Sequence, residues 1–389
     1  MTIERARLWE LALPLTVPFA ISGGVMRVRR SLIVELVSSD GATGFGESAP
    51  FELPFYSSET LESARWMLTT VLLPRLVKHT LATPLDADTL LTAGVRGNPF
   101  ARAGAETAAW DLFCHRRGVS LLDLLTETLG TAGVDDRHLA ASPHISCGIA
   151  LGIPEDESSQ TVATWTREAL RRGYRRVKVK VRPGWDIIPI RAARSAITAG
   201  NHSVPLWADA NASYDLDRDA DALRAIDEEQ LLFIEQPLQH DDLVDHAKLA
   251  GVLRTPLCLD ESLRDARWAR HALSLGASRI WNVKVQRMGG LAEALRVYAI
   301  AAANDVALWG GTMPETGIGA RAILALGALP RFVYPSDVEP SERWYAPGAD
   351  PLPLVMGADG TMPVPRERGL ATLGVGEKVK ERGRLVWES

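Results

Sequence analysis

Residues 206–209 read LWAD, residues 232–235 read LFIE and residues 257–260 read LCLD, so three short apolar runs each end in an acid. Successive acids are 26 and 25 residues apart, and the intervals carry helical patterns. This spacing is typical of one strand and one helix in a parallel α/β unit. We therefore predict that the three acids end successive parallel strands.

The same alternation of strand and helix patterns extends on both sides of this stretch. Eight strands with helical spacers make up a (β/α)8 barrel, which takes roughly 250 residues. A doubly wound open sheet explains the strands equally well but not the shared position of the acids. We therefore predict an α/β fold with a (β/α)8-type TIM barrel. The predicted strands are residues 145–150, 176–181, 205–208, 231–234, 256–259, 280–285, 306–309 and 332–334.

The first part of the chain has a different pattern, with strands followed by helices. This order indicates a small α+β domain that ends near residue 130. Its predicted elements are strands at residues 28–37 and 44–47, helices at 58–71 and 101–115, and a linker at 131–136. The predicted domains are residues 1–130 (α+β), 140–345 (barrel) and 346–389 (C-terminal segment).

Composition and charge exclude several classes of function. The chain is 46% hydrophobic and 23% charged with a net charge of −5, which is a globular balance without the clustered basic face of a nucleic-acid-binding protein. Its three cysteines form no CxxC pair and indicate a reducing compartment. Neither a signal peptide nor a membrane-spanning apolar stretch is found in the sequence. We expect a cytoplasmic protein that binds neither nucleic acid nor a membrane.

Three acids at one barrel mouth require a counter-charge. The carboxyl ends of barrel strands meet at the face where TIM-barrel active sites lie. Three converging carboxylates repel one another, so one of them takes up a proton unless a cation is present. Hard oxygen ligands that leave positions open for water and substrate suit Mg²⁺. A single such acid is more often a helix cap, but three in register favour a metal site at Asp209, Glu235 and Asp260.

Two lysines alternate along the predicted second strand, which reads RVKVKV at residues 176–181. Lys178 and Lys180 share one face because they are two residues apart. At a sheet edge this face would be solvated, whereas in a closed barrel the lysines point inward, where the carboxylates offset their charge. We expect crowding and burial to lower a lysine pKa towards the range of a catalytic base. Lys284 ends the sixth strand and would flank the metal opposite Lys180.

These groups together predict removal of a proton next to a substrate carboxylate, with Lys180 as the base. Such a proton is very weakly acidic, and a metal at the carboxylate oxygens stabilises the charge that develops. Gly311 and Thr312, after the seventh strand, would let a substrate approach backbone amides or would form a simple turn. A barrel that binds metal or ligand without catalysis is the alternative, and the lysine pair argues against it.

Several motifs resemble the muconate-lactonizing subgroup of the enolase superfamily, in which a Lys or His base works with Mg²⁺. They are KVK at 178–180, DAN at 209–211, IEQP at 234–237, LDES at 259–262 and NVK at 282–284. Further motifs resemble the o-succinylbenzoate synthase / N-acylamino acid racemase family within it, over nearly the whole chain. They are PFYSSE at 54–59, GWD at 184–186, GG at 289–290, PETG at 314–317 and MPVP at 362–365.

The resemblance implies a capping domain built from the N-terminal part and the C-terminal tail, with mobile loops near residues 19–26 and 50–56. It implies Mg²⁺, or Mn²⁺ in its place, on the three acids. In the synthase, Lys180 is the base for elimination of water in menaquinone synthesis and Lys284 stabilises charge from the other face. In the racemase, the two lysines exchange protons on opposite faces of an N-succinyl or N-acetyl amino acid. Lys178 would hold the substrate carboxylate.

The resemblance also implies a pocket for a small carboxylate substrate and a homo-oligomer. Two pocket positions depart from the family, with Ala150 in place of the usual Ser and Thr312 in place of Gly, and residues 335–339 (PSDVE) depart from Gly-Asp-Thr/Ser. These changes bear on substrate identity. The synthase is the first hypothesis and the racemase the second, and both use the same residues. The implied substrate-binding residues are Phe19, Phe51, Tyr56, Ala150, Asn211, Arg287, Gly311, Thr312 and Met313.

Overall fold

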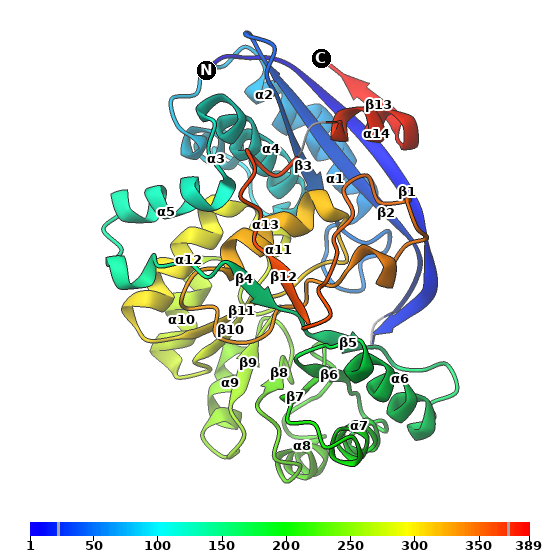
Figure 1. Ribbon diagram of the computed structural model, residues 1–389. Coiled ribbons are helices and arrows are strands. Elements are labelled where there is room, and N and C mark those ends of the chain that lie inside the picture. The colour runs from blue at the N-terminus through cyan, green and yellow to red at the C-terminus, as the bar shows by residue number, and fades with distance from the viewer. Residues whose placement is uncertain (22–23, 372–373) are drawn as a thin grey trace.

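The structure is a computed structural model that describes residues 1–21, 24–371 and 374–389. It consists of an antiparallel sheet with its helices, which caps a barrel of parallel strands (Figure 1). Within these described ranges, no helix is long and apolar enough to cross a membrane. The predicted α/β class, TIM barrel and capping domain are confirmed.

The capping sheet has the strand order β13-β1-β2-β3. Strands β1 (Ile3–Ile21) and β2 (Gly24–Ser38) form a long hairpin, and β3 (Thr43–Ser48) pairs with β2. Strands β2 and β3 correspond to the predicted strands at residues 28–37 and 44–47, whereas β1, which contains Pro14, has no predicted counterpart. Proline weakens a strand pattern because it donates no backbone hydrogen bond, and the register of β1 shifts between Pro14 and Phe19.

Helices cover the capping sheet. The helix predicted at residues 58–71 is interrupted by a π-helical turn, and the helix predicted at 101–115 is α4. Helix α4 packs tightly on β3 because Gly44 and Gly46 have no Cβ, which would collide with the α4 backbone. The elements are α1 (Leu61–Met67), the π-helical turn (Leu68–Leu72), α2 (Leu73–Leu76), α3 (Pro84–Thr92), α4 (Pro99–Arg117) and α5 (Leu121–Thr131).

Seven strands form the parallel sheet of the barrel in chain order. They are β5 (Ile149–Leu151), β6 (Val177–Lys180), β7 (Leu206–Asp209), β8 (Ile234–Glu235), β9 (Leu257–Leu259), β10 (Ile280–Val283) and β11 (Ala307–Gly310). The helices that alternate with them are α6 (Ser159–Arg171), α7 (Ile187–Ala199), α8 (Ala220–Asp227), α9 (Leu243–Ala250), α10 (Ala266–Leu275), α11 (Val285–Met288), α12 (Leu291–Ala303) and α13 (Gly317–Gly327).

The eighth predicted strand, residues 332–334, is not a regular strand, and this prediction is wrong. This part of the chain instead makes isolated parallel bridges to both neighbours, Leu308 with Phe332 and Cys147 with Ser336. Pro335 lies between the two bridges and has no N–H to donate to a ladder. The segment still closes the ring through these bridges. Eight chain segments therefore surround the barrel axis, although only seven are regular strands, and we call residues 332–336 the eighth stave.

The first predicted barrel strand, residues 145–150, is divided into two. Strand β4 (His144–Ser146) pairs with β12 (Thr361–Pro363) outside the parallel sheet, and β5 enters the barrel. The division occurs at Gly148, where a Cβ would collide with the buried guanidinium of Arg176. The apolar pattern of residues 145–150 is continuous, so it does not show that the chain changes its pairing partner from β12 to β6.

The C-terminal part of the chain returns to the capping sheet through α14 (Val375–Arg382) and β13 (Arg384–Glu388). Strand β13 pairs antiparallel with β1, with Arg7 opposite Glu388. Figure 1 shows this red strand beside the blue strands of the N-terminal hairpin. The predicted completion of the capping domain by the C-terminal tail is confirmed.

Buried glutamates of the capping domain fasten it to barrel helices. Glu106 accepts hydrogen bonds from the backbone N–H groups of Leu291 at 2.7 Å and Ala292 at 2.8 Å, at the start of α12. Glu47 does the same at α13, where it accepts from Thr316 N at 3.1 Å. Burial raises the pKa of both glutamates to about 7. Each carboxyl caps a helix whose first N–H groups have no partner within the helix.

Candidate active site

The ends of neighbouring barrel strands are in register at the mouth. Lys180 lies opposite Asp209, and Asp209 lies opposite Glu235. Asp260 follows β9 directly, and Lys284 lies between β10 and α11. The parallel ladder therefore brings the predicted acids and lysines to the same end of the barrel.

The acids contact amines rather than one another. Lys180 Nζ lies 2.5 Å from Asp209 Oδ2, and Lys284 Nζ lies 3.0 Å from Asp260 Oδ2. Lys178 lies between two acids, with Nζ 3.3 Å from both Asp209 Oδ2 and a Glu235 oxygen. Each buried charge therefore has an oppositely charged partner, as burial requires.

Side chains of the barrel hold the acids in place. Asn282 donates its Nδ2 hydrogen bond to Glu235 Oε1 at 2.8 Å. Gly311 lies against Asn282, where a Cβ would collide with the side-chain amide. The side-chain oxygen of Gln236 accepts a hydrogen bond from the backbone N–H of Asp260 at 3.0 Å. Gly311, which we predicted at the substrate, instead leaves room for Asn282 and does not line the pocket.

The three acids have the donor chemistry of a site for a hard divalent cation. Burial, and then the charge of Asp209, raise the pKa of Glu235 to about 8 even though Lys178 lies beside it, so a bound cation would favour the ionised form of this carboxyl. Glu261, next to Asp260, also has a buried oxygen that accepts no hydrogen bond. Among the residues that the structure describes, no three Asp, Glu, His or Cys side chains form a ready metal-binding group, since the amines take up the acid oxygens. The residues fit an oxygen-liganded cation such as Mg²⁺.

The lowered lysine pKa that we predict for the Lys178 and Lys180 pair is wrong for Lys178. Burial alone lowers the pKa of Lys178, but the surrounding carboxylates, Asp337 foremost, outweigh burial and raise it well above its ordinary value. Asp260 likewise raises the pKa of Lys284 against the effect of burial. In this structure the ammonium groups serve as the counter-charges of the acids.

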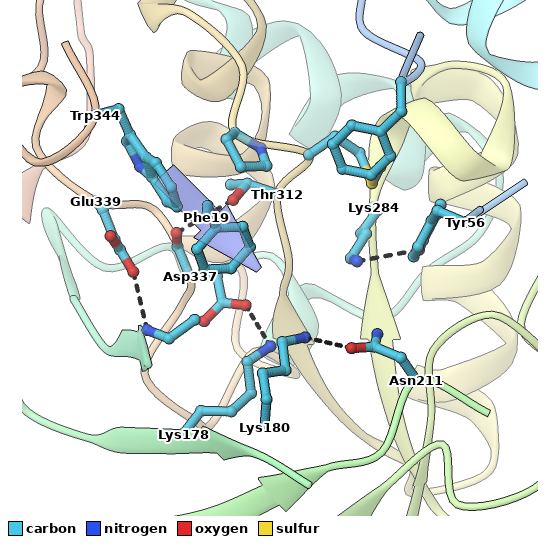
Figure 2. A pocket seen from close by; sticks show the side chains of 14 residues that line it. Phe19, Tyr56, Lys178, Lys180, Asn211, Lys284, Thr312, Asp337, Glu339 and Trp344 are labelled. Atoms are coloured by element: carbon cyan, nitrogen blue, oxygen red, sulfur yellow. Dashed lines mark hydrogen bonds and ion pairs between the residues drawn. The ribbon is translucent and has the colours of Figure 1, made fainter. Parts of the chain in front are cut away.

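A pocket of about 470 Å³ opens above these groups, between the barrel mouth and the capping domain (Figure 2). Both Lys180 and Lys284 line it, from different sides of the barrel. Asp209, Glu235 and Asp260 are not among the residues that line it. The predicted residues that line it are Phe19, Phe51, Tyr56, Ala150, Lys178, Lys180, Asn211, Lys284, Thr312 and Met313.

Tyr56 links the capping domain to the catalytic end of the barrel. Its hydroxyl donates to Asp260 Oδ1 at 3.2 Å and accepts from Lys284 Nζ at 3.0 Å and from Arg287 at 3.1 Å. Arg287 also pairs with Asp260. Arg287 therefore holds Asp260 in place and does not line the pocket. The predicted loop near residues 50–56 does reach the pocket, because it supplies the hydroxyl of Tyr56.

The other predicted loop, residues 19–26, is the end of the β1–β2 hairpin. Phe19 pairs with Met26, and residues 22 and 23 lie outside the described residues. The Phe19 ring meets the Trp344 ring edge-on, with centroids 5.0 Å apart. These two aromatic rings form one wall of the pocket (Figure 2).

Four pocket residues were not among the predicted site residues: Pro314, Asp337, Glu339 and Trp344. Asp337 Oδ2 accepts a hydrogen bond from Lys178 Nζ at 2.6 Å. Asp337 and Glu339 follow the eighth stave, as the three acids follow earlier strands. Their position after the eighth apolar run of the sequence is the signal that points to them.

The site and the fold agree with the comparisons to known proteins. Residues 4–126 match the mandelate racemase / muconate lactonizing enzyme N-terminal domain, and residues 161–373 match the enolase C-terminal domain-like family. The chain is 40% identical to an o-succinylbenzoate synthase from Geobacillus kaustophilus, over 89% of this chain and 86% of that protein. It is 41% identical to an N-succinylamino acid racemase from Thermus thermophilus, over 95% and 94%.

A solved structure from Listeria innocua, a member of the enolase superfamily, matches with a TM-score of 0.87 and 32% identity. The match covers all of this chain and 98% of that one. The match thus includes both the capping domain and the barrel. The chain belongs to the enolase superfamily, in the family that contains o-succinylbenzoate synthases and N-succinylamino acid racemases.

Proposed function

We propose that this protein is a Mg²⁺-dependent o-succinylbenzoate synthase, which eliminates water from its substrate in menaquinone synthesis. The observation that carries the proposal is that Lys180 and Lys284 line one pocket above three buried acids. Synthase relatives from Geobacillus kaustophilus and Bacillus subtilis, 40% and 37% identical over 89% and 88% of this chain, support the assignment.

In the proposed reaction, Lys180 removes the proton next to the substrate carboxylate. The same amine then returns this proton to the departing hydroxyl, so that water leaves from the face from which the proton came. Lys284 stabilises negative charge from the opposite face, and Lys178 holds the carboxylate. The phenol of Tyr56 orients Lys284, to which it is hydrogen-bonded at 3.0 Å.

Asp209, Glu235 and Asp260 would hold Mg²⁺, or Mn²⁺ in its place. When bound, the ion supplies positive charge that stabilises the developing charge of the substrate carboxylate as a Lewis acid. Asn282 and Gln236 keep two of the ligands in position through the hydrogen bonds described above. The ligand set is supported by its shared position at successive strand ends.

Racemisation of N-succinylamino acids is the second candidate. The opposed lysines favour it, because one amine can remove a proton that the other replaces on the opposite face. The racemase relative from Thermus thermophilus supports it with 41% identity, and one from Amycolatopsis is 35% identical over 98% of the chain. A cytoplasmic location and a homo-oligomer remain predictions from the sequence.

The test is to incubate the protein and Mg²⁺ with each substrate. Formation of the aromatic product is followed by absorbance, and racemisation by loss of optical rotation. Deuterium exchange at the substrate α-carbon separates an enzyme from a barrel that only binds ligand. Turnover of neither substrate would contradict both candidates, and turnover that persists in Lys180→Ala would remove this lysine from its role.

A further inference from the structure

Glu261 is a buried carboxylate that directly follows Asp260 at the end of β9 and is only 7% exposed. Its Oε1 accepts a hydrogen bond from Asn211 Nδ2 at 2.9 Å, and its Oε2 is buried without a partner. Among the residues that the structure describes, the contact with Asn211 is thus the one hydrogen bond of this side chain. A buried carboxylate with a single hydrogen bond lowers stability, so folding alone does not account for Glu261.

Asn211 joins Glu261 to the proposed base. The side-chain oxygen of Asn211 accepts a hydrogen bond from Lys180 Nζ at 2.7 Å (Figure 2). The Asn211 side chain therefore lies between a carboxylate, which contacts its nitrogen, and an amine, which contacts its oxygen. A chain of hydrogen bonds runs from Glu261 through Asn211 to Lys180.

The donors and acceptors in this chain allow only one orientation of the Asn211 amide. An amide has one oxygen that accepts and one NH₂ group that donates, whereas an ammonium group can only donate and a carboxylate can only accept. With the amide turned by half a rotation, its NH₂ group would face the ammonium group of Lys180 and its oxygen would face Glu261. Glu261 therefore favours the orientation in which the amide oxygen faces Lys180.

This oxygen is one of two acceptors that hold Lys180 Nζ. The other is Asp209 Oδ2, at 2.5 Å. A metal ion on Asp209 would compete with Lys180 for that carboxylate, whereas Asn211 lies outside the proposed ligand set. Asn211 can therefore hold the amine in place when the metal site is filled.

Lys284, on the other side of the pocket, is held by different partners. Its Nζ contacts Asp260 Oδ2 and the hydroxyl of Tyr56, each at 3.0 Å. Within the part of the chain that the structure describes, neither Asn211 nor Glu261 forms a hydrogen bond with Lys284. The hydrogen bonds of Glu261 and Asn211 thus support only one of the two opposed lysines.

We propose that Glu261 is a positioning residue that acts through Asn211, keeping the amide oxygen of Asn211 on Lys180 Nζ and so holding this amine at one face of the substrate. The proposal rests on the proposed function, because it takes Lys180 as the base. Glu261 is not among the residues that line the pocket. Its effect therefore reaches the substrate through Lys180 and is confined to one face.

The test measures α-proton exchange of both enantiomers of N-succinylphenylalanine by NMR in D₂O with Mg²⁺ present. Lys180→Ala identifies the enantiomer whose α-proton faces Lys180, because its exchange is lost. Glu261→Leu, which has no side-chain acceptor, is expected to slow exchange of this enantiomer about three- to tenfold relative to the other, the effect of one lost hydrogen bond. Since both enantiomers are measured on the same protein, their ratio does not depend on the folded fraction.

Glu261→Gln is the matched control. It removes the same negative charge as Glu261→Leu but keeps an oxygen that can accept from Asn211 Nδ2. The charge of Glu261 also acts on Lys284, and both variants remove it, so a difference between them reports the hydrogen bond alone. Glu261→Gln is expected to keep the ratio of the two exchange rates close to that of the wild type.

A second measurement needs no substrate. Nitrogen-15 NMR follows the exchange of the Lys180 ammonium protons with water, and their resonance is assigned by its loss in Lys180→Ala. Exchange is expected to be about threefold faster or more in Glu261→Leu than in the wild type, because the amide no longer holds the amine. Glu261→Gln is expected to exchange like the wild type.

The outcomes separate this proposal from the proposed function. Equal slowing of both enantiomers in Glu261→Leu, or the same ratio in Glu261→Leu and Glu261→Gln, would overturn the role of Glu261. If the wild type exchanges neither enantiomer and does not form o-succinylbenzoate, the proposed function fails and the ammonium protons decide. Faster exchange of these protons in Glu261→Leu would then support the hold of Glu261 on Lys180, and unchanged exchange would overturn it.

Discussion

Asp337 accepts a hydrogen bond from Lys178 Nζ at 2.6 Å and thereby ties the eighth stave of the barrel to β6. The other oxygen of Asp337 pairs with Arg176, whose side chain is fully buried and stacks 4.2 Å from the centroid of Trp207. A single carboxylate therefore neutralises two buried cations. Its loss leaves both of them without their nearest counter-charge.

Asp337→Asn is expected to lower the free energy of unfolding by about 3–5 kcal/mol, the cost of breaking a buried ion pair from one side. Urea denaturation measures the change. The control Asp305→Asn removes the partner of Arg331 from a site where the aspartate side chain is 91% exposed, and is expected to cost about 0–1 kcal/mol. Equal losses in the two variants would show that the Asp337 contacts contribute no more than a surface pair.

The two opposed lysines predict different stereochemical losses. Lys180→Ala is expected to lower dehydration about 10²–10⁴-fold, the usual contribution of a general base. Lys284→Ala is expected to keep α-proton exchange for one enantiomer of an N-succinylamino acid and to lose it for the other, because only one face still has an amine. Proton NMR in D₂O measures both, and equal loss for both enantiomers in Lys284→Ala would contradict the two-face arrangement.

Glu235→Gln is expected to weaken Mg²⁺ binding about tenfold or more, since even residues that only support a ligand change metal affinity by about 10–100-fold. Asn282 would still contact the side chain, so the geometry is largely retained. Calorimetric titration with Mg²⁺ gives the affinity, with Glu342→Gln as a surface control. Unchanged affinity in Glu235→Gln would remove Glu235 from the ligand set.

The buried cap Glu106 predicts a specific pH dependence. Burial raises its pKa from 4.5 to about 7 in the folded chain, so between these values the folded state binds more protons than the unfolded state. Stability is therefore expected to fall as the pH rises through this window, with a slope of up to about 1.4 kcal/mol per pH unit. Glu106→Gln removes this contribution.

Urea denaturation of the wild type and Glu106→Gln between pH 5 and about 8 tests the slope. The difference in stability between the two proteins is expected to shift in favour of the variant as the pH rises. Glu127→Gln is the control, because Glu127 is exposed and pairs with Arg117. Parallel curves for wild type and Glu106→Gln would contradict a raised pKa at this cap.

The barrel could be predicted because the alternation of side chains along each strand and the interval between successive strands are the same in the sequence and in the fold. The alternation that gives Lys178 and Lys180 one face is a property of any strand, and the spacing of the acids fixed their places at the ends of β7, β8 and β9. Proline was the main source of error. It concealed β1, and at Pro335 it turned the eighth predicted strand into isolated bridges.

The error in the predicted pKa of the site lysines came from distances between side chains that are far apart in the sequence, which the sequence alone does not give. A low pKa for Lys178 requires cations to dominate its surroundings, but the structure has the carboxylate of Asp337 beside it. Glu339 was visible as a departure from the family pattern. Only the fold shows that Glu339 accepts a hydrogen bond from the backbone N–H of Ala150 and forms an ion pair with Arg343.

The pairing of β13 with β1 has a consequence for synthesis of the protein. Strand β13 is made after the whole barrel, yet it covers the outer edge of a strand that begins at Ile3. While the ribosome is translating the barrel, the backbone N–H and C=O groups along that edge are open to other chains, and such an edge promotes aggregation. Nascent chains that stop short of Arg384 should therefore depend on chaperones more than the full-length chain does.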